Sequence, residues 1–271
     1  MMSMADYAKA GLPLADVPII DEHNHLGRWS AFYVPGGGTI DQMVRRMDQV
    51  GISKICVTAH ASIGPDYVYG NNLVMDALQR HPDRVVGYVT VNPNYPEDMQ
   101  HELDRCFAVP GFRAIKFHPE CHNQPVDCKG YESAFEEAEK RACPILIHVW
   151  GDEAVHAVDG LAPRFPHAVF IMAHMGGTDG HSMEKAVDVI NRHTNVYGDV
   201  ALSRPTDGNI EWLVKEIGSR RLLFGPDMPF YDPSHVIARV ALSEISEEEK
   251  RDVFYRNAAR IMKLDDPEYK K

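Results

Sequence analysis

Two histidines near the N-terminus, His23 and His25, have the type and spacing of metal ligands. They end an apolar run that begins at Ile19, and Asp21 lies two residues before the first of them. If the run is a β-strand, alternation places Asp21, His23 and His25 on one face. Two imidazoles on a rigid face, with a carboxylate beneath them, can hold a divalent metal. A strand that ends in histidines without binding a metal would show the same pattern. The arrangement of the remaining strands and helices has to distinguish the two interpretations.

The rest of the chain repeats one pattern, a short apolar run followed by a helix-like segment. The apolar runs cover residues 17–25, 52–60, 84–92, 111–119, 144–150, 168–175, 195–202 and 221–229. The fifth, sixth and eighth runs are almost continuously apolar, which is typical of strands buried on both faces. Capping boxes that open at Thr39 and Ser246 mark two of the helices. Eight such units in 271 residues predict a (β/α)8 barrel, the TIM-barrel fold of the α/β class, with extra C-terminal helices.

An open doubly wound sheet is the alternative arrangement of alternating strands and helices. Such a sheet usually has fewer strands and carries a glycine-rich phosphate loop directly after the first one. The glycines at 36–38 come too late for that loop and match no such motif. We therefore expect residues 1–16 to be a short polar leader and residues 17–271 to form a single barrel domain.

The composition restricts the partners of the protein. Apolar residues make up 44% of the chain and charged residues 25%, which is ordinary for a globular protein with a sizeable core. The net charge of −11 argues against nucleic acid or an anionic membrane as the main partner, although local charges can still bind small anionic substrates. No apolar run is long enough to span a membrane. With five cysteines, no CxxC spacing and no signal peptide, we expect a cytoplasmic protein, and a homodimer is the default assembly.

Histidines gather where a barrel carries its chemistry. Six of the fourteen histidines fall at the C-terminal ends of the predicted strands, namely His23, His25, His60, His118, His148 and His174. Catalytic residues of (β/α)8 barrels lie at these ends, and Asp227 closes the eighth predicted strand. Alternation places His148 on the face of Trp150. It places His174 on the face of Met172. The other eight histidines fall in predicted helices or loops, where we expect solvated side chains.

A metal centre is the simplest chemistry for these strand ends. The candidate ligands are His23, His25, His148 and Asp227. This mixed set of imidazole nitrogens and a carboxylate suits Zn²⁺ best and also accepts Mn²⁺, Fe²⁺ or Co²⁺. A metal-bound water has its pKa lowered from about 15.7 to roughly 7, and Asp227 could take its proton as general base. His174 could ligate, orient the water or stabilise a developing oxyanion.

The motifs at the strand ends follow a fixed order along the chain. They are His23-x-His25, Ile115-Lys116-Phe117-His118-Pro119, Ile147-His148, Ala173-His174-Met175-Gly176-Gly177, Phe224-Gly225-Pro226-Asp227 and Arg256-Asn257-Ala258-Ala259-Arg260. In this order they resemble the amidohydrolase superfamily, and in particular its amidohydrolase-2 branch. The resemblance runs from the first predicted strand to the last helix. It implies a metal-dependent barrel in which the four candidate ligands bind the metal, Asp227 shuttles protons and His174 polarises substrate or water.

The fourth strand decides how many metals the resemblance implies. Relatives with two metals bridge them with a carboxylated lysine or a glutamate on that strand. Lys116 could be carboxylated, but in the lysine-x-His-Pro branch this lysine faces the substrate, so we favour one metal. His118 is then a supporting residue or a substrate contact. The metal-dependent DNases of the superfamily carry a glutamate where this chain has Lys116, and they fit poorly.

The first loop, residues 27–38, is the most informative about the substrate. It is long and aromatic and ends in three glycines, so it is either a lid with a glycine hinge or a packed surface loop. Arg28 lies just past the histidine pair and could grip a substrate carboxylate in a bidentate manner. Further candidates for the substrate-binding wall are Lys116, His118, Trp150, Arg204 and Tyr231. Together they suggest a small substrate that is carboxylated or derived from an aromatic compound.

Three classes of function remain open. The first is hydrolysis of a C–O or C–N bond in a lactone, ester or amide by activated water. The second is a non-oxidative decarboxylase or hydratase on the same scaffold, acting on an aromatic or muconate-like acid. The third is a binding protein without catalysis, which the intact ligand set disfavours. We favour hydrolysis at this point, because Asp227, His174 and a full ligand set fit water activation directly.

Overall fold

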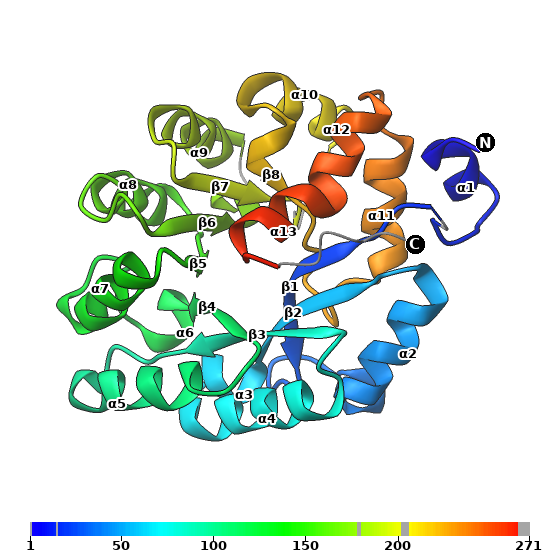
Figure 1. The fold of residues 1–271 in the computed structure, drawn as a ribbon. Helices are drawn as coiled ribbons and strands as arrows, with labels where there is room; N and C mark the ends of the chain where they lie inside the picture. Colours follow the sequence, from blue (N-terminus) through cyan, green and yellow to red (C-terminus); the bar gives the residue numbers. More distant parts are fainter. Residues whose placement is uncertain (1, 15, 178–179, 202–205, 265–271) are drawn as a thin grey trace.

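Eight parallel strands form the inner wall of the molecule, and each is hydrogen-bonded to the next strand in chain order (Figure 1). The computed structural model describes residues 2–14, 16–177, 180–201 and 206–264. The strands are β1 (Ile20–Leu26), β2 (Lys54–Ala59), β3 (Val85–Thr90), β4 (Phe112–Phe117), β5 (Pro144–His148), β6 (Val169–Ala173), β7 (Val196–Asp199) and β8 (Leu222–Leu223). Every predicted apolar run overlaps one of them, and only β1 extends past its run, by one residue, so the (β/α)8 prediction is confirmed.

The chain segment after β8 closes the barrel against β1. The Glu22 N–H donates to the Phe224 carbonyl (2.9 Å), the Asp227 N–H to the His23 carbonyl (3.0 Å), and the His25 N–H to the Met228 carbonyl (2.8 Å). A Cβ on Gly225 would lie 2.7 Å from the Cβ of His23, so only glycine permits this approach. The backbone therefore ties the histidine pair directly to Asp227.

Helices surround the strands on the outside (Figure 1). They are α1 (Met4–Lys9), α2 (Ile40–Val50), α3 (His60–Ile63), α4 (Tyr67–Arg80), α5 (Pro96–Phe107), α6 (Pro119–His122), α7 (Glu132–Arg141), α8 (Asp152–Leu161), α9 (Gly180–Arg192), α10 (Asn209–Ile217), α11 (Pro233–Leu242), α12 (Glu247–Arg251) and α13 (Asn257–Ile261). Both predicted capping boxes are present, at Thr39 and at Ser246. Helix α4 begins at Tyr67, because the Asp66 side chain caps it at the Tyr69 N–H.

Two apolar layers hold these elements together. The outer layer lies between strands and helices and includes Ile145 and Ile147 of β5. The inner layer fills the barrel and includes Leu146 of the same strand. Helix α13 contributes Ala258 and Ile261 to the inner layer and so covers one end of the barrel. Burial of both faces explains why this strand reads as a continuous apolar run.

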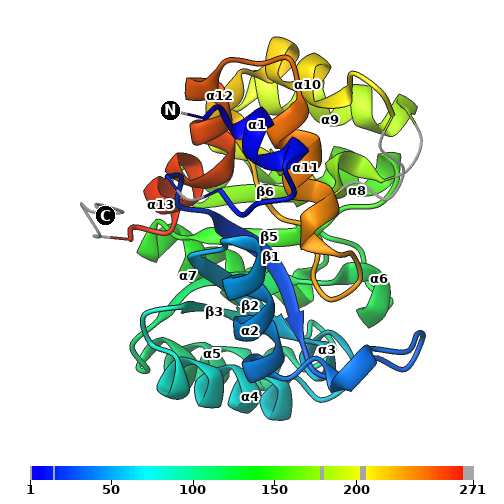
Figure 2. The same ribbon diagram turned by 90° about the vertical axis from the view of Figure 1, so that its right-hand side faces the viewer.

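The terminal segments pack onto the barrel. Figure 2 shows α1 beside α11, and the buried Met4 of α1 joins the outer apolar layer. A short π-helical stretch, residues 252–256, joins α12 to α13. Within the described residues, no helix combines the length and the apolar character needed to cross a membrane. All five cysteines are free thiols.

Candidate metal centre

Strand β1 carries an irregularity at the point where it enters the site. Asp21 pairs with Ile55 of β2, but Asn24 pairs with Val57, so three steps along β1 match two along β2. Glu22 and His23 therefore share a single position opposite β2, as in a β-bulge. The prediction that Asp21 shares a face with both histidines is wrong for this reason. The Asp21 carboxylate is buried and accepts the backbone N–H of His23 (3.2 Å), so it supports the bulge.

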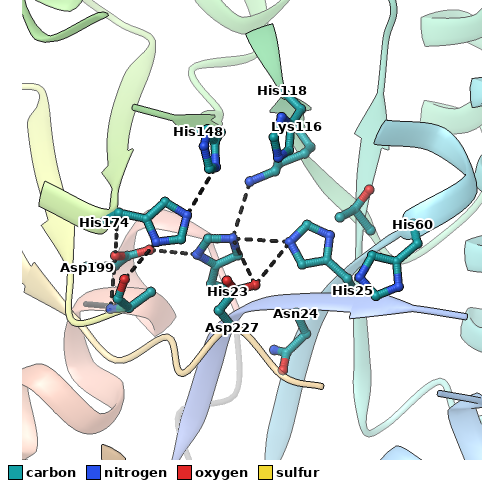
Figure 3. Close-up of polar contacts among 12 residues, drawn as sticks. His23, Asn24, His25, His60, Lys116, His118, His148, His174, Asp199 and Asp227 are labelled. Carbon is teal, nitrogen blue, oxygen red and sulfur yellow. Dashed lines mark hydrogen bonds and ion pairs between the residues drawn. The ribbon is translucent and has the colours of Figure 1, made fainter. Parts of the chain in front are cut away.

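His23 is the centre of the resulting cluster (Figure 3). Its Nε2 lies 3.4 Å from Nε2 of His25 and 3.7 Å from Oδ1 of Asp227. The same Asp227 oxygen lies 3.2 Å from Nε2 of His25. All three side chains are at least nine-tenths buried. The structure therefore brings together three of the predicted ligands.

Asp199, the last residue of β7, orients this cluster and was missed in the sequence. Its Oδ2 accepts a hydrogen bond from Nδ1 of His23 (2.8 Å), and its Oδ1 accepts the backbone N–H of His174 (2.8 Å). With Nδ1 protonated, His23 offers its Nε2 lone pair to the cluster, the usual arrangement of a metal-binding histidine and its carboxylate partner. The position of Asp199 at the end of a strand was the only signal for it in the sequence.

Glu22 is a second buried carboxyl group that the sequence did not single out. Its Oε2 accepts a hydrogen bond from the Tyr88 hydroxyl (3.0 Å) inside the barrel. Burial, together with the neighbouring charge of Asp199, raises the pKa of Glu22 well above its usual range. Glu22 therefore lies beneath the cluster, next to Asp199, where its protonated form is favoured.

His174 reaches the site through a turn rather than through strand alternation. Met172 of β6 points into the outer layer, so alternation would turn His174 away from the barrel axis. The strand instead ends at Ala173, and His174 takes a left-handed conformation with φ of +65°. Its Nδ1 donates to the Ala201 carbonyl (2.7 Å), which leaves the Nε2 lone pair free to point into the cluster. The predicted face was wrong, but the predicted location in the site was right.

His148 lies at the outer edge of the cluster. Its Nδ1 is 3.1 Å from Nε2 of His174, and its Nε2 is 3.0 Å from Oε2 of Glu120. The ring is stacked between His118 (4.0 Å between centroids) and Trp150 (5.6 Å). The ligand atoms of His23, His174 and Asp227 all lie within 4.8 Å of one another, so His174 belongs to the tightest group and His148 flanks it.

Lys116 points inward from β4, as alternation predicts, while Ile115 and Phe117 join the outer layer. Its Nζ lies 3.3 Å from Nε2 of His23 (Figure 3), and the side chain is fully buried. Burial lowers the pKa of Lys116 to about 8. Its positive charge beside His23 compensates nearby carboxylates and disfavours a second divalent ion at the same place.

The electrostatics of the cluster favour neutral imidazoles beside an ionised carboxylate. Burial lowers the pKa of His23, His25 and His174. Burial alone would raise the pKa of Asp227, but its contacts with His23 and His25 outweigh this and hold the pKa well below its usual range. Neutral imidazole nitrogens and one carboxylate oxygen, oriented by Asp199 and the Ala201 carbonyl, fit a divalent metal of the zinc or manganese type.

Aromatic rings form one wall beside His25. The ring of His60 stacks on His25 (5.1 Å, 6° between planes), and its Nδ1 donates to the Gly27 carbonyl (2.8 Å). Trp29 lies 5.3 Å from His60. Phe32 of the same loop lies 3.9 Å from Phe230, which itself contacts His25. The first loop is thus packed onto the site by aromatic contacts.

The predicted substrate-binding residues occupy different places. Trp150 is 42% exposed and lines a cavity of about 540 Å³ together with His148 and Glu120. His118 is buried, and its Nδ1 accepts the Cys121 N–H (3.3 Å). Arg28 lies against Gly37 of its own loop and lines an outer cavity instead of the histidine cluster.

Tyr231 and Arg204 are the two remaining candidates for the substrate-binding wall. The Tyr231 N–H lies 3.4 Å from the Asp227 carbonyl, so this residue follows the site directly. Arg204 lies outside the described residues. Among the histidines predicted at the surface, His122 is buried, and its Nδ1 contacts the Tyr131 hydroxyl (3.1 Å). That prediction was wrong because the short helix α6 turns His122 inward.

Comparison with known proteins identifies the family. The family model Amidohydro_2, described as amidohydrolase, matches residues 57–264. The chain belongs to this amidohydrolase family. The gamma-resorcylate decarboxylase of Polaromonas sp. (strain JS666 / ATCC BAA-500) is 23% identical over an alignment 287 positions long, which covers 83% of this chain and 87% of the relative. The resemblance inferred from the strand-end motifs is therefore confirmed.

Solved structures of similar fold include two dihydroxybenzoate decarboxylases. A 2,6-dihydroxybenzoate decarboxylase in complex with 2,6-dihydroxybenzoate has a TM-score of 0.76 and 18% identity, covering 92% of this amidohydrolase and 99% of that chain. The dihydroxybenzoic acid decarboxylase of Polaromonas sp. JS666, with bound manganese and the inhibitor 2-nitroresorcinol, has a TM-score of 0.73 and 19% identity, covering 92% and 97%. These similarities confirm the barrel fold of this family member.

Proposed function

We propose that this amidohydrolase is a metal-dependent, non-oxidative decarboxylase of a small planar acid, an aromatic or similarly conjugated carboxylate with a hydroxyl group beside the carboxylate. The observation that carries the proposal is the position of Asp227 and His174. Both proton-transferring groups lie in one buried cluster with His23 and His25, flanked by flat aromatic side chains. The names of the relatives support this class of reaction over the hydrolysis that the sequence alone favoured.

In this proposal His23, His25, His148 and Asp227 hold one divalent ion, with His174 directly beside them. When bound, the ion would supply Lewis-acid binding of the substrate oxygens. The imidazole-rich donor set is well suited to zinc. Manganese is an equal candidate, because a decarboxylase of similar fold binds manganese. A cytoplasmic location and a homodimeric assembly stay predictions from the sequence.

The protein groups have to move one proton. Decarboxylation breaks the bond between the ring carbon and the carboxylate; the electron pair stays on the carbon, CO₂ leaves, and a proton takes its place. Asp227 is ionised, so it must first take this proton from the substrate hydroxyl or from solvent before it delivers the proton to carbon. His174, with its lone pair on Nε2, can orient the substrate or share the proton.

The aromatic side chains account for the shape of the proposed substrate. Trp150, stacked on His148 and partly exposed, offers one flat surface, and Phe32 and Phe230 offer aromatic rings near His25. A flat acid can slide between such surfaces and gain stacking energy of about 1 kcal/mol for each ring contact. Lys116 and His118 stay proposed substrate contacts, whereas Arg28 would need a rearrangement of its loop to reach the substrate.

Hydrolysis is the second candidate, because an ionised Asp227 would also be a suitable general base for water that a bound ion activates. One experiment separates the two reactions. The manganese- or zinc-loaded protein is incubated with 2,6-dihydroxybenzoate and, separately, with a panel of lactones and aryl esters. We expect CO₂ release and the decarboxylated phenol from the first incubation. Base consumption with lactones and no CO₂ from any hydroxybenzoate would replace the decarboxylase proposal by hydrolysis.

A further inference from the structure

Glu120 lies at the border between the histidine cluster and the adjoining cavity. It follows His118 and Pro119 at the end of β4, in the first turn of α6. Its side chain is 67% exposed and lines the cavity of about 540 Å³. Despite this exposure, its Oε2 reaches Nε2 of His148 at 3.0 Å. An exposed carboxylate thus contacts a proposed ligand from outside.

This contact fixes which nitrogen of His148 carries the proton. An ionised carboxylate only accepts hydrogen bonds, so Nε2 of His148 must donate to Glu120. In a neutral imidazole the lone pair then lies on Nδ1. That Nδ1 faces the cluster, 3.1 Å from Nε2 of His174.

The His174 nitrogen that faces Nδ1 of His148 also carries a lone pair. The Nδ1 proton of His174 is engaged with the Ala201 carbonyl (2.7 Å), so its Nε2 has no proton to donate to His148. Two lone pairs 3.1 Å apart repel each other, and a cation bound to either one relieves the repulsion. The two rings are therefore arranged for cation binding rather than for a hydrogen bond between them.

Stacking restricts the alternatives open to His148. Its ring lies 14° from the plane of His118 and 4° from the plane of Trp150, with centroid distances of 4.0 and 5.6 Å. The stack fixes the ring plane, so two alternatives remain. A half-turn of the ring would place Cδ2 where Nδ1 now lies and Cε1 where Nε2 now lies, and a change of tautomer would move the proton from Nε2 to Nδ1. Stacking is nearly the same in all of these states, and the contact with Glu120 distinguishes them.

We propose that Glu120 is a positioning residue that selects the orientation and tautomer of His148, so that His148 presents Nδ1 to the metal. The inference rests on the proposed metal centre and adds an outer carboxylate to it. Asp199 does the same for His23 from inside the barrel, through the opposite ring nitrogen. Outer carboxylates of this kind orient the ligand and increase its basicity.

The test observes the nitrogens of His148 directly. The protein is labelled with ¹⁵N-histidine and loaded with zinc, and the ring signals of His148 are assigned by their loss in His148→Gln. In the wild type we expect the proton on Nε2 and the metal-shifted signal on Nδ1. In Glu120→Ala and Glu120→Gln we expect a mixture of the Nε2-protonated and Nδ1-protonated tautomers of His148, because alanine offers no acceptor and glutamine can either accept or donate. A metal-shifted Nε2 in the wild type, or unchanged signals in both variants, would overturn the inference.

Zinc affinity, measured by competition with a chromophoric chelator, is the second readout. We expect Glu120→Ala to weaken binding by about tenfold, the lower end of typical outer-residue effects, and Glu120→Gln to weaken it less. The matched control is Glu153→Ala, which removes another exposed carboxylate from the same cavity and should leave affinity unchanged. An equal loss of zinc affinity in the control would show that the removed negative charge alone weakens binding, and would overturn the inference. If the wild-type protein binds no stoichiometric zinc, the proposed metal centre itself is refuted. If the wild type binds zinc but the Glu120 variants behave like the wild type, only the role of Glu120 is refuted.

Discussion

The two sides of the histidine cluster are built in different ways. On the side of β1, β7 and β8, the backbone hydrogen bonds of His23 and Asp227 fix their positions, and Asp199 fixes the His23 ring. On the side of β4 and β5, the His148 ring is oriented by stacking on His118 and Trp150 and by the exposed Glu120. The side chains on the first side are buried, and several hydrogen bonds fix their positions. The second side borders a cavity. The inner side is therefore suited to fixed chemistry, and the outer side to adjustment of substrate and metal binding.

The largest effect should come from the inner side. Asp227→Asn keeps the shape but removes both a proposed ligand and the proton-transferring group, so turnover should fall by at least about 10³-fold. The measurement is the rate of CO₂ release under saturating metal and substrate. Asp232→Asn, an exposed carboxylate five residues later, is the matched control and should keep full activity. Substantial turnover in Asp227→Asn would refute the proton-transfer role.

Asp199→Asn tests whether the inner side depends on the hidden carboxylate. The substituted amide can still accept from Nδ1 of His23, but the negative charge that increases the basicity of that ligand is lost. We expect metal affinity to fall by about 10- to 100-fold. Chelator competition measures this effect, with Asp159→Asn on the helical surface as the control. Unchanged affinity would show that the burial of His23 alone is sufficient.

The same contrast explains what the sequence could predict. The strand count and the histidines at strand ends follow from periodicity, the helix caps follow from local capping motifs, and the structure agrees with all three. Alternation failed at Asp21 and His174, because a bulge and a left-handed turn interrupt the strands there. Such irregularities depend on tertiary contacts and leave no periodic signal. Asp199 and Glu120 were missed because each acts through a histidine, and single carboxylates after a strand are too common to stand out.

Trp150→Ala should have a moderate effect confined to the outer side. Trp150 is 42% exposed, so its loss should change the free energy of unfolding by less than about 1 kcal/mol. The missing wall should raise KM by about tenfold while kcat changes little, because stacking is present in the ground and transition states alike. Steady-state kinetics and thermal unfolding measure both effects. Tyr69→Ala removes an exposed aromatic side chain from another cavity and serves as the control. A loss of kcat instead of KM would assign Trp150 to the chemistry.

The smallest effect is expected for Arg28→Ala. The sequence suggested a carboxylate clamp, but the guanidinium lies against Gly37, on a loop that Phe32 holds against Phe230. If this packing persists when substrate binds, KM should change by less than about threefold, since no charge-assisted contact is lost. Phe32→Ala provides the sharper comparison, because it releases the loop without touching Arg28. A large increase of KM in Arg28→Ala, matched by Phe32→Ala, would show that the loop closes over the substrate, and would move Arg28 from the outer surface into the binding site.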